Sequence, residues 1–340
     1  MASGSICLFP RLTSTGGPSS FQKKMTVSLE QKGVEVHFDP ERSDVAAILV
    51  IGGSRHLGQL KQAKKRGVRI VQRLDGMNWL HKKTNTGCKH YLRSEWNNRI
   101  LSTIRNNYAD SIVYQSEFTR NWWNQVYQCA PVPDTVIHNG VDLEMFNPHG
   151  VGKSPQDHIR IMAVETSMVG GHERDILNAI GFAKALADVS THEMELVVAG
   201  KAPPQLLTTL PTYSNLKINW LGIIPLESIP EWDRSSHLFF SAEINAACPN
   251  TVMEAMACGL PVVSFATGSL PELVQGGAGK IAAYGSDHWE LEEPDFTAIS
   301  QAGLDILENQ SSYRKAARKR AEDYFDMHDM AQKYLEVLVP

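Results

Sequence analysis

The 340-residue sequence lacks the features that mark several protein classes. No stretch approaches the roughly 18 consecutive apolar residues of a transmembrane helix, and the first residues have no basic segment typical of a secretory signal. The five cysteines are scattered without a C-x-x-C pair, so we expect neither a disulfide framework nor a zinc site. Isolated thiols suit a reducing compartment, and we expect a cytoplasmic protein that binds no metal.

Charge of one sign is also scarce. Lysine and arginine number 33 against 37 aspartates and glutamates, which gives a formal net charge of −4. Because proteins that bind nucleic acid usually carry a basic excess, nucleic acid is not an expected partner. The hydrophobic content of 42% is that of a packed globular protein, and the length favours two domains over one.

The hydrophobic pattern predicts alternating strands and helices in both halves of the chain. In the first half, strands are expected at 6–10, 34–38, 47–51, 68–74 and 111–115, and helices at 19–32, 56–66, 91–108 and 118–127. In the second half, strands are expected at 159–164, 196–199, 218–221, 237–241 and 261–265, and helices at 174–187, 226–234 and 251–258. This alternation indicates an α/β fold with one parallel sheet in each half.

A stretch rich in proline, glycine and asparagine at 146–155 has the composition of a linker. We therefore predict a first domain over 1–150 and a second over 151–322. The tail from 296 to 339 is nearly all helical, and its last part, 323–340, is predicted to return to the first domain. Doubly wound sheets bind ligands at the carboxyl ends of their strands, so a nucleotide or phosphorylated metabolite is the first ligand class to consider.

Glu254 is the most informative residue of the second half. The predicted helix around it is apolar on nearly every side and should be buried. A buried carboxylate costs several kcal/mol unless a partner compensates it. Glu254 could accept hydrogen bonds from two ligand hydroxyls, as a ribose diol offers, or it could form a capping box with Thr251 as the N-cap. The local pattern leaves both interpretations open.

Several segments resemble those of a known family. Residues 249–263 (PNTVMEAMACGLPVV) and 267–274 (TGSLPELV) resemble the donor-site motif of the retaining glycosyltransferases of family 4, which have the GT-B fold. Residues 136–148 (VIHNGVDLEMFNP) are similar to that family's interdomain segment. Gly16-Gly17 resembles its glycine loop, and residues 73–76 (RLDG) resemble a variant found in some members.

The resemblance implies two Rossmann-like domains that face each other across a cleft, with C-terminal helices packing back on the first. It implies a metal-independent, retaining hexosyltransferase of polysaccharide or glycoconjugate biosynthesis. The donor would be a nucleotide-diphosphate sugar acting as co-substrate, with no cofactor. The acceptor, whether a glycan, a glycolipid or another molecule, would lie against the first domain.

The resemblance also assigns donor-binding roles. Glu254 would bind the donor ribose, beside Asn250 and Thr251 at the start of the same helix. The diphosphate would lie against Gly16, Gly17 and this helix end, where backbone N–H groups and the helix dipole favour anions.

Two positions near the donor sugar carry candidate catalytic residues. Members of the family usually carry Glu-x7-Glu, but seven residues separate Glu254 from a position that is occupied by Ala246 here. The nearby Glu243 and Asn245 are candidates to replace the missing carboxylate. Asp75 would contact the transferring sugar or an acceptor hydroxyl, and the alternative is a turn residue that caps its loop.

The family usually places an arginine and a lysine after the first strand of the second domain, and the stretch 164–174 has neither at the expected spacing. His172, Arg174 and Lys201 are candidates to stabilise the diphosphate instead. The alternatives to an active transferase are a nucleotide-sugar-binding homologue with little or no activity, and a sugar-nucleotide epimerase of the same fold.

Two further features concern surfaces. The basic run at 314–320 could contact an anionic membrane, which would place the protein at the inner membrane surface, or it could be a solvated helix face. A second basic face is expected at 61–66. Trp122 and Trp123 are adjacent, so one is expected to pack inward and the other to be partly exposed, as an acceptor platform would require.

Overall fold

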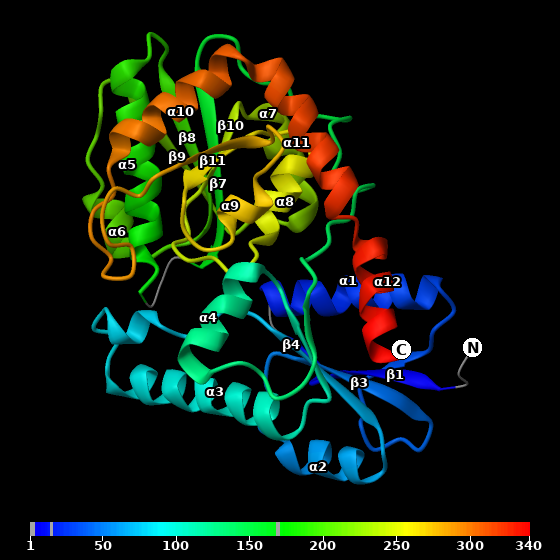
Figure 1. Cartoon of the computed structure of the whole chain (residues 1–340). Helices are drawn as coiled ribbons and strands as arrows, with labels where there is room; N and C mark the ends of the chain where they lie inside the picture. Colours follow the sequence, from blue (N-terminus) through cyan, green and yellow to red (C-terminus); the bar gives the residue numbers. More distant parts are fainter. Residues whose placement is uncertain (1–3, 14–15, 168–170) are drawn as a thin grey trace. The chain divides into compact units, whose positions relative to one another are not determined.

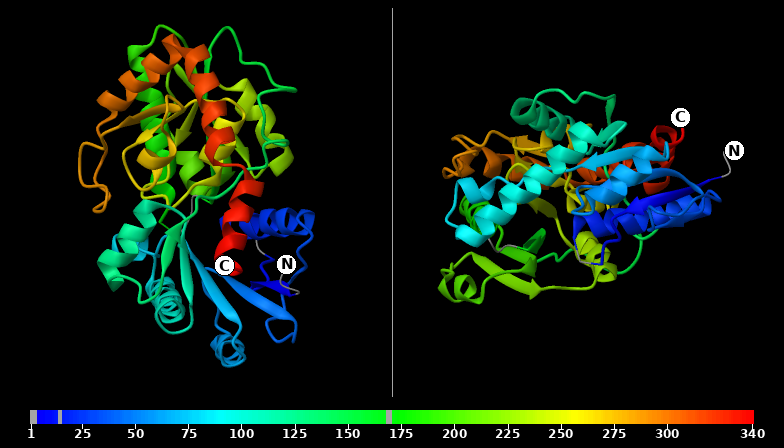
Figure 2. Two further views of the ribbon diagram at one scale, coloured as in Figure 1. Left: turned by 45° about the vertical axis from the view of Figure 1, so that its right-hand side comes forward. Right: turned by 90° about the horizontal axis from the view of Figure 1, so that it is seen from below.

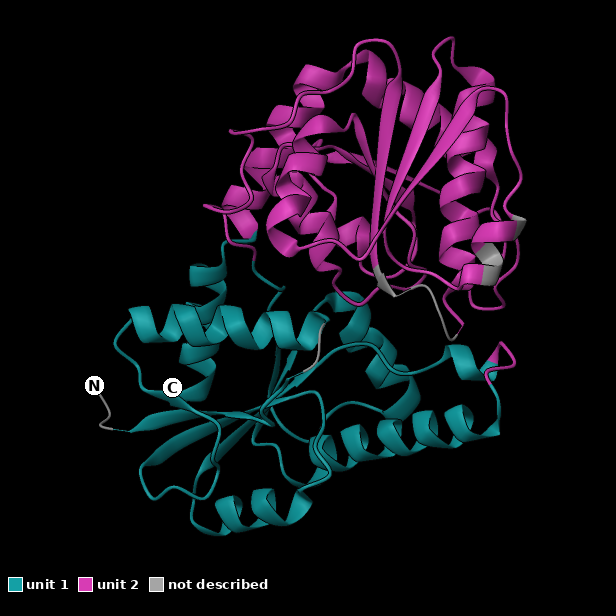
Figure 3. Cartoon of the chain, turned by 180° about the vertical axis from the view of Figure 1, so that it is seen from behind, with its two compact units in different colours: residues 1–82, 87–140, 325–340 teal, residues 83–86, 141–324 magenta. Residues whose placement is uncertain are grey.

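The computed structural model describes residues 4–13, 16–167 and 171–340. The chain divides into two compact units (Figure 3): residues 1–82, 87–140 and 325–340 form unit 1, and residues 83–86 and 141–324 form unit 2. The linker-like stretch 146–155 lies within unit 2 rather than at its border. Arg234 holds it there by donating hydrogen bonds to the carbonyl oxygens of Asn147 and Val151, at 3.1 and 2.7 Å.

Unit 1 contains a six-stranded parallel sheet in the order β2-β1-β3-β4-β5-β6. Its strands are β1 (Ser5–Phe9), β2 (Val36–His37), β3 (Val45–Ile51), β4 (Arg69–Leu74), β5 (Ser111–Tyr114) and β6 (Asp134–Val136). Its helices are α1 (Gly17–Gln31), α2 (Leu57–Lys65), the short η1 (Leu80–Lys82), α3 (Cys88–Asn107), α4 (Glu117–Tyr127) and α12 (Met327–Leu338). The sequence predicts all of these except the three-residue elements β6 and η1.

Alternate residues of the central strand β3 face two different helical layers (Figure 1). Leu49 and Ile51 pack with α1 and α12 on one face of the sheet. Ile48 and Val50 pack with α2 and α3 on the other face. This two-sided burial explains why the strand reads as a continuous apolar run, as is typical of parallel sheets.

Within the described part of the tail, α12 alone belongs to unit 1. It lies alongside α1 (Figure 2), where Phe21 and Tyr334 meet edge to face with ring centroids 5.2 Å apart. A side chain at Gly140 would place its Cβ 2.5 Å from the Cα of Met327, so the close approach of this helix requires glycine. The two preceding helices of the tail pack on unit 2 instead.

Unit 2 contains a second six-stranded parallel sheet, in the order β12-β11-β10-β7-β8-β9. Its strands are β7 (Ile159–Ser167), β8 (Met194–Lys201), β9 (Leu216–Gly222), β10 (Leu238–Ser241), β11 (Val262–Phe265) and β12 (Gly279–Ala282). Its helices are α5 (Glu173–Val189), α6 (Pro204–Thr209), η2 (Leu226–Ser228), α7 (Ile229–Ser235), α8 (Asn250–Ala257), α9 (Leu270–Leu273), α10 (Phe296–Glu308) and α11 (Gln310–Tyr324). The two parallel sheets confirm the predicted fold class.

The arginines of the basic run at 314–320 lie on α11 and bind unit 2 itself. Each donates to two backbone carbonyl oxygens; the acceptors are Ser236 and Gly259 for Arg314, Phe146 and Ala257 for Arg318, and Glu272 and Leu273 for Arg320. These guanidinium groups therefore form neither a solvated face nor a free basic surface. No helix of the described residues is apolar enough over a sufficient length to cross a membrane.

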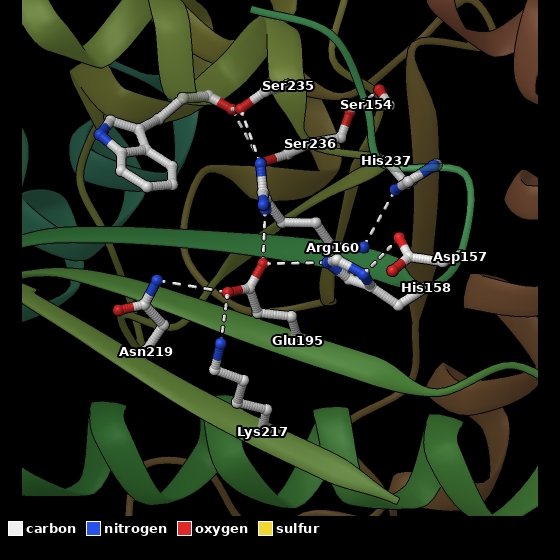
Figure 4. Close-up of polar contacts among 11 residues, drawn as sticks. Ser154, Asp157, His158, Arg160, Glu195, Lys217, Asn219, Ser235, Ser236 and His237 are labelled. Carbon is white, nitrogen blue, oxygen red and sulfur yellow. Dashed lines mark hydrogen bonds and ion pairs between the residues drawn. The ribbon is translucent and has the colours of Figure 1, made fainter.

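A buried carboxylate joins the amino ends of three strands of unit 2 (Figure 4). Glu195 on β8 accepts a hydrogen bond from Arg160 Nε on β7 at 2.6 Å. Asn219 on β9 donates to it at 3.2 Å, and His158 Nε2 also lies 3.2 Å away. Burial alone raises the pKa of Glu195, but the hydrogen bonds from Arg160, His158 and Asn219 outweigh it and hold the pKa below its usual value.

Replacing Glu195 with alanine is expected to lower the free energy of unfolding by about 2–3 kcal/mol, because the Arg160 cation is left without its carboxylate. A carboxyl group with a lowered pKa stabilises the fold above its unfolded pKa and loses that contribution as the pH falls through its folded pKa. Wild-type stability should therefore drop on the acid side, and the Glu195→Ala variant should show a smaller drop. Urea unfolding at several pH values measures this. Exposed Glu193 is the matched control, and an equal loss in Glu193→Ala would contradict the account.

Candidate functional site

The strand order of unit 2 reverses direction between β7 and β10. Strands β8 and β9 are added in turn on one side of β7, and β10, β11 and β12 are added in turn on its other side. Loops that follow two such neighbouring strands diverge and leave a crevice at the carboxyl ends, where α/β proteins bind their ligands. The loop after β10, the start of α5 and the start of α8 all lie at this edge.

Glu254 lies on α8, a helix buried on nearly every side, and its own exposed fraction is 4%. In the described structure α8 has Pro249 as its N-cap and no side-chain capping bond. Thr251 is the second residue of the helix, so the capping box predicted as an alternative is wrong. Binding of two ligand hydroxyls, the role that the family resemblance implies for Glu254, stays a prediction.

A second buried carboxylate lies next to Glu254. Burial, and then the charge of Glu254, raise the pKa of Asp233 on α7 well above its usual value. Asp233 is fully buried, and the sequence pattern did not single it out.

The loop after β10 holds a strained and unsatisfied asparagine. Asn245 has φ of 58°, a left-handed conformation uncommon for non-glycine residues, and its exposed fraction is 3%. Neither amide atom of Asn245 has a hydrogen-bond partner among the described residues. Buried polar groups are almost always paired, so an orphaned amide in a strained loop is typical of a ligand site.

Ala246, at the position of the missing carboxylate, is fully buried. Its carbonyl oxygen accepts a hydrogen bond from the Ser269 N–H at 2.9 Å. Gly268 has φ of 58°, and a Cβ there would lie 2.5 Å from the Ala246 oxygen. The turn after β11 therefore presses directly on this backbone, and the neighbouring Asn245 and Glu243 are left as the polar side chains of the loop.

The loop after β10 lies among carboxyl groups, whereas the family resemblance led us to expect cations here. They belong to Glu243 in the loop itself, Glu165 on β7 and Asp175 on α5. Burial, followed by the charge of Asp175, raises the pKa of Glu243 to about 7. Burial, together with the charges of Glu243 and Asp175, also raises the pKa of Glu165 at the end of β7. The backbone N–H groups of Ala242 and Glu243 donate to Glu165, so this carboxylate anchors the loop to β7.

The cations of this edge come from α5 and β8. His172 Nδ1 lies 3.1 Å from Asp175 Oδ2. Burial lowers the pKa of His172, but Asp175 and Glu243 more than offset this, so the pKa is raised above its usual value. The Nε of Arg174 is buried without a partner among the described residues. Lys201 ends β8 and is exposed, and residues 168–170 of the stretch 164–174 lie outside the described part of the chain.

Unit 1 carries its own predicted site residues at the carboxyl edge of its sheet. Gly16 has φ of 124°, which favours glycine, and precedes Gly17 at the start of α1. Asp75 follows β4 directly, and its carbonyl oxygen accepts a hydrogen bond from Trp123 Nε1 at 2.8 Å. Burial raises the pKa of Asp75, while the positive charge of Arg73 and the residue's own N–H lower it in part.

Arg73 is a buried cation in unit 1, and its burial was not predicted from the sequence. Its exposed fraction is 1%, its guanidinium lies 3.9 Å from the centroid of the Phe21 ring, and its Nη2 donates to Asn139 at 2.8 Å. The Nε and Nη1 atoms have no hydrogen-bond partner among the described residues. A buried cation of this kind is costly, and its charge acts on the nearby Asp75.

The structure corrects the prediction for the tryptophan pair. Trp122 and Trp123 are both buried, with exposed fractions of 8% and 0%. Trp122 packs on Phe118, and Trp123 stacks on Tyr127 with ring centroids 5.2 Å apart. Neither ring offers an acceptor platform, because the turn at the end of β4 and the aromatic residues of α4 cover both.

The predicted residues thus fall into two groups. In unit 2, Glu243, Asn245, Asn250, Thr251 and Glu254 lie in the loop after β10 and the helix that follows it, Arg174 begins α5, and Lys201 ends β8. In unit 1, Gly16, Gly17 and Asp75 follow β1 and β4. Among the described residues, no three His, Cys, Asp or Glu side chains are arranged to hold a metal ion.

Comparison with known proteins identifies the same part of unit 2. Residues 166–309 match the family model described as glycosyl transferases group 1. The GPI3 subunit of phosphatidylinositol N-acetylglucosaminyltransferase from Saccharomyces cerevisiae is 22% identical over 258 residues, covering 72% of this chain and 54% of that protein. D-inositol 3-phosphate glycosyltransferase 1 from Catenulispora acidiphila is 25% identical over 193 residues, covering 53% of this chain and 46% of that protein. The chain thus spans about half the length of these curated relatives.

Solved structures share the fold over almost the whole chain. Sucrose-phosphate synthase from Thermosynechococcus elongatus has a TM-score of 0.74 at 16% identity and covers 98% of both chains. Anabaena HepE, solved with UDP-glucose, has a TM-score of 0.67 at 16% identity, covering 98% of this chain and 99% of its own. WaaG, a glycosyltransferase of lipopolysaccharide biosynthesis, has a TM-score of 0.67 at 13% identity over the same shares. The chain therefore has the GT-B fold, and residues 166–309 of its second unit are similar to glycosyl transferases group 1.

Proposed function

We propose that this protein is a glycosyltransferase that moves a sugar from a nucleotide-diphosphate sugar to an acceptor hydroxyl with retention of anomeric configuration. The observation that carries the proposal is the buried carboxylate Glu254 on α8, at the crevice edge of unit 2 and within the segment that matches glycosyl transferases group 1. The proposed role of Glu254 is to accept hydrogen bonds from the two ribose hydroxyls of the donor. None of the similar proteins named above is an epimerase.

The proposed donor diphosphate lies at the start of α8. Asn250 and Thr251 are the first two residues of this helix, whose free N–H groups and dipole favour negative charge. His172, with its raised pKa, and Arg174 are the candidate cations for the leaving group, with Lys201 as the exposed one. HepE, with the same fold, was solved with UDP-glucose, which supports a donor of this chemical class.

The donor sugar would be held by the loop after β10. In the proposed reaction the bond between the anomeric carbon and the phosphate oxygen breaks, and its electron pair leaves with the diphosphate. The acceptor oxygen bonds to the same face of the carbon, and the proton of the acceptor hydroxyl passes to the Asp75 carboxylate. The unpaired amide of Asn245 can bind sugar hydroxyls both as donor and as acceptor. Unit 1 would supply Gly16 and Gly17 to the diphosphate and Asp75 to the sugar or acceptor hydroxyl. We propose that the transfer uses no metal, so a chelator should leave its rate unchanged.

Donor binding is expected to weaken as the pH rises through about 7. The pKa of Glu243 is about 7, so this carboxyl group is neutral below that pH and anionic above it, close to the proposed anionic donor. One added negative charge at short range should lower donor affinity about fivefold. Calorimetric titration of a nucleotide sugar at pH 6 and pH 8 measures the change.

Two variants separate the effect of Glu243 on donor binding from that of the neighbouring His172. Glu243→Gln should bind the donor with nearly the same affinity at both pH values. His172→Gln changes a neighbouring side chain of the same site, and this variant should keep the pH dependence that Glu243 causes. A pH dependence unchanged in Glu243→Gln would remove this residue from the donor site.

A second candidate function is nucleotide-sugar binding with little or no transfer. It is favoured by the buried Ala246 at the usual carboxylate position and by the carboxylates Glu165 and Asp175 where cations are expected. Both carboxyl groups accept hydrogen bonds from loop N–H groups, and neither can supply the positive charge that would stabilise a leaving diphosphate.

Release of nucleoside diphosphate tests the two candidates against each other. The chain is incubated with a panel of nucleotide-diphosphate sugars, with and without chelator, and free nucleoside diphosphate is followed over time. Steady release above the rate of the Glu254→Gln variant supports a transferase. Tight donor binding without release supports the binding protein, and neither binding nor release contradicts both.

A further inference from the structure

An exposed face of α3 in unit 1 combines bulky apolar side chains with cations. Leu92 is 68% exposed and Trp96 is 56% exposed, far more than is usual for such large side chains. Lys89, Arg93 and Arg99 are exposed as well. These five residues recur at spacings of three and four along the helix, so they share one face.

The opposite side of α3 explains why this face is left open. Ser94, Asn98 and Leu101, which follow one another at spacings of four and three, form a stripe on that opposite side and are buried. The helix is therefore already anchored through this buried stripe. Leu92 and Trp96 are not part of that stripe, and their exposure is not needed for the fold of unit 1.

The charge of this layer is strongly one-sided. Helices α2 and α3 cover the same face of the sheet, and the acidic residue in the two helices is Glu95 alone. Glu95 is paired with His81 and Lys82, at 2.7 and 3.0 Å. Two further lysines of α2, Lys61 and Lys65, are exposed. This layer is thus basic, although the whole chain has a net charge of −4.

We propose that the outer face of α3, formed by Lys89, Leu92, Arg93, Trp96 and Arg99, docks on a bilayer that contains anionic lipids. Tryptophan and leucine would enter the headgroup region, and the flanking cations would bind lipid phosphates. Two apolar side chains are too few for the core of a stable protein–protein interface. The same two side chains are enough for peripheral binding when several cations add to them.

This proposal is independent of the sugar-transfer proposal. It assigns membrane binding to α3 rather than to the basic run at 314–320 on α11. The arginines of the basic run on α11 donate to backbone carbonyls. On α3, by contrast, Glu95 pairs with His81 and Lys82 of η1, and Lys89, Arg93 and Arg99 are exposed. The membrane face is therefore a property of the first unit.

Co-sedimentation of the full chain with vesicles tests the proposal. The vesicles contain phosphatidylcholine alone or phosphatidylcholine with phosphatidylglycerol, at low and at high salt. The wild type should bind the anionic vesicles, bind phosphatidylcholine poorly, and lose affinity at high salt. Leu92→Ser with Trp96→Ser should weaken binding about tenfold or more, and Arg93→Gln or Arg99→Gln about fivefold each.

The matched control lies on unit 2. Ile223 and Leu226 are 76% and 46% exposed, and Ile223→Ser with Leu226→Ser should bind vesicles as the wild type does. Equal binding to both kinds of vesicle, or equal losses in the α3 and control variants, would overturn the proposal. Self-association that the α3 double variant abolishes, without vesicle binding, would assign the face to a second copy and overturn it as well.

Discussion

Replacing Glu254 with glutamine is expected to weaken binding of a nucleotide-diphosphate sugar about 100-fold while the chain stays folded. Glutamine has the same size, but it carries no charge and has only one oxygen to accept hydrogen bonds. Hydrogen bonds to a charged group contribute about 1.5–3 kcal/mol each, and a 100-fold loss corresponds to about 2.7 kcal/mol. Calorimetric titration of the wild type and the variant with the same donor measures the difference.

Asp233→Asn is the matched control for this experiment. Asp233 is a buried carboxyl group beside Glu254, and burial raises its pKa, which favours the neutral form that asparagine resembles in size and charge. This variant should bind the donor with nearly wild-type affinity. If both variants lost affinity equally, the effect would come from disturbed packing between α7 and α8, and the ribose assignment of Glu254 would fail.

Asp75→Asn is expected to lower the turnover number about 10³-fold and to leave donor affinity unchanged. A positioned acid or base typically contributes 10²- to 10⁴-fold to a reaction. Asparagine keeps the size of aspartate and can still accept a hydrogen bond from its own backbone N–H, so a loop-capping role would survive the change. Steady-state kinetics together with donor titration separate the two roles.

The control for Asp75 is an exposed turn residue of the same unit. Asp39 accepts a hydrogen bond from the Glu41 N–H at 2.9 Å, as a turn aspartate does. Asp39→Asn should leave turnover unchanged. A full rate in Asp75→Asn would make Asp75 a turn residue only.

The sequence predicted the fold because both halves repeat the same strand–helix period. The interior strand β3 is buried on both faces and therefore appears as one apolar run, which is easily recognised. The edge strands β6 and β12 were missed because most of their residues are only partly buried, so neither forms an apolar run in the sequence. The border between the units also escaped, since the stretch 146–155 has a linker's composition but is held to unit 2 by Arg234.

The candidate site was predictable where it depends on local sequence. Glu254 could be recognised because a carboxylate stands out in an apolar helix. Glu165 and Asp175 could not, because their importance arises from contacts with the loop after β10, which is far away in the sequence. The strain of Asn245 likewise depends on the turn at Gly268, whose backbone presses on Ala246.

Basic runs show the same limit. The run on α11 looks like a surface in the sequence, but Arg314, Arg318 and Arg320 bind backbone carbonyls of unit 2. The cations of α3 are spread over eleven residues and form no run, yet the helix gathers them on one face with Leu92 and Trp96. Which cations can bind a ligand or a surface therefore depends on their contacts in the fold and on helix geometry, not on how many lie close together in the sequence.

The most direct test of the proposed donor site compares a ribonucleoside diphosphate with its 2′-deoxy counterpart. Calorimetric titration of the wild type should show tighter binding of the ribonucleotide, by about tenfold, because Glu254 accepts a hydrogen bond from each ribose hydroxyl. In Glu254→Gln this preference should largely disappear. Equal affinity of the wild type for the two nucleotides would contradict the account.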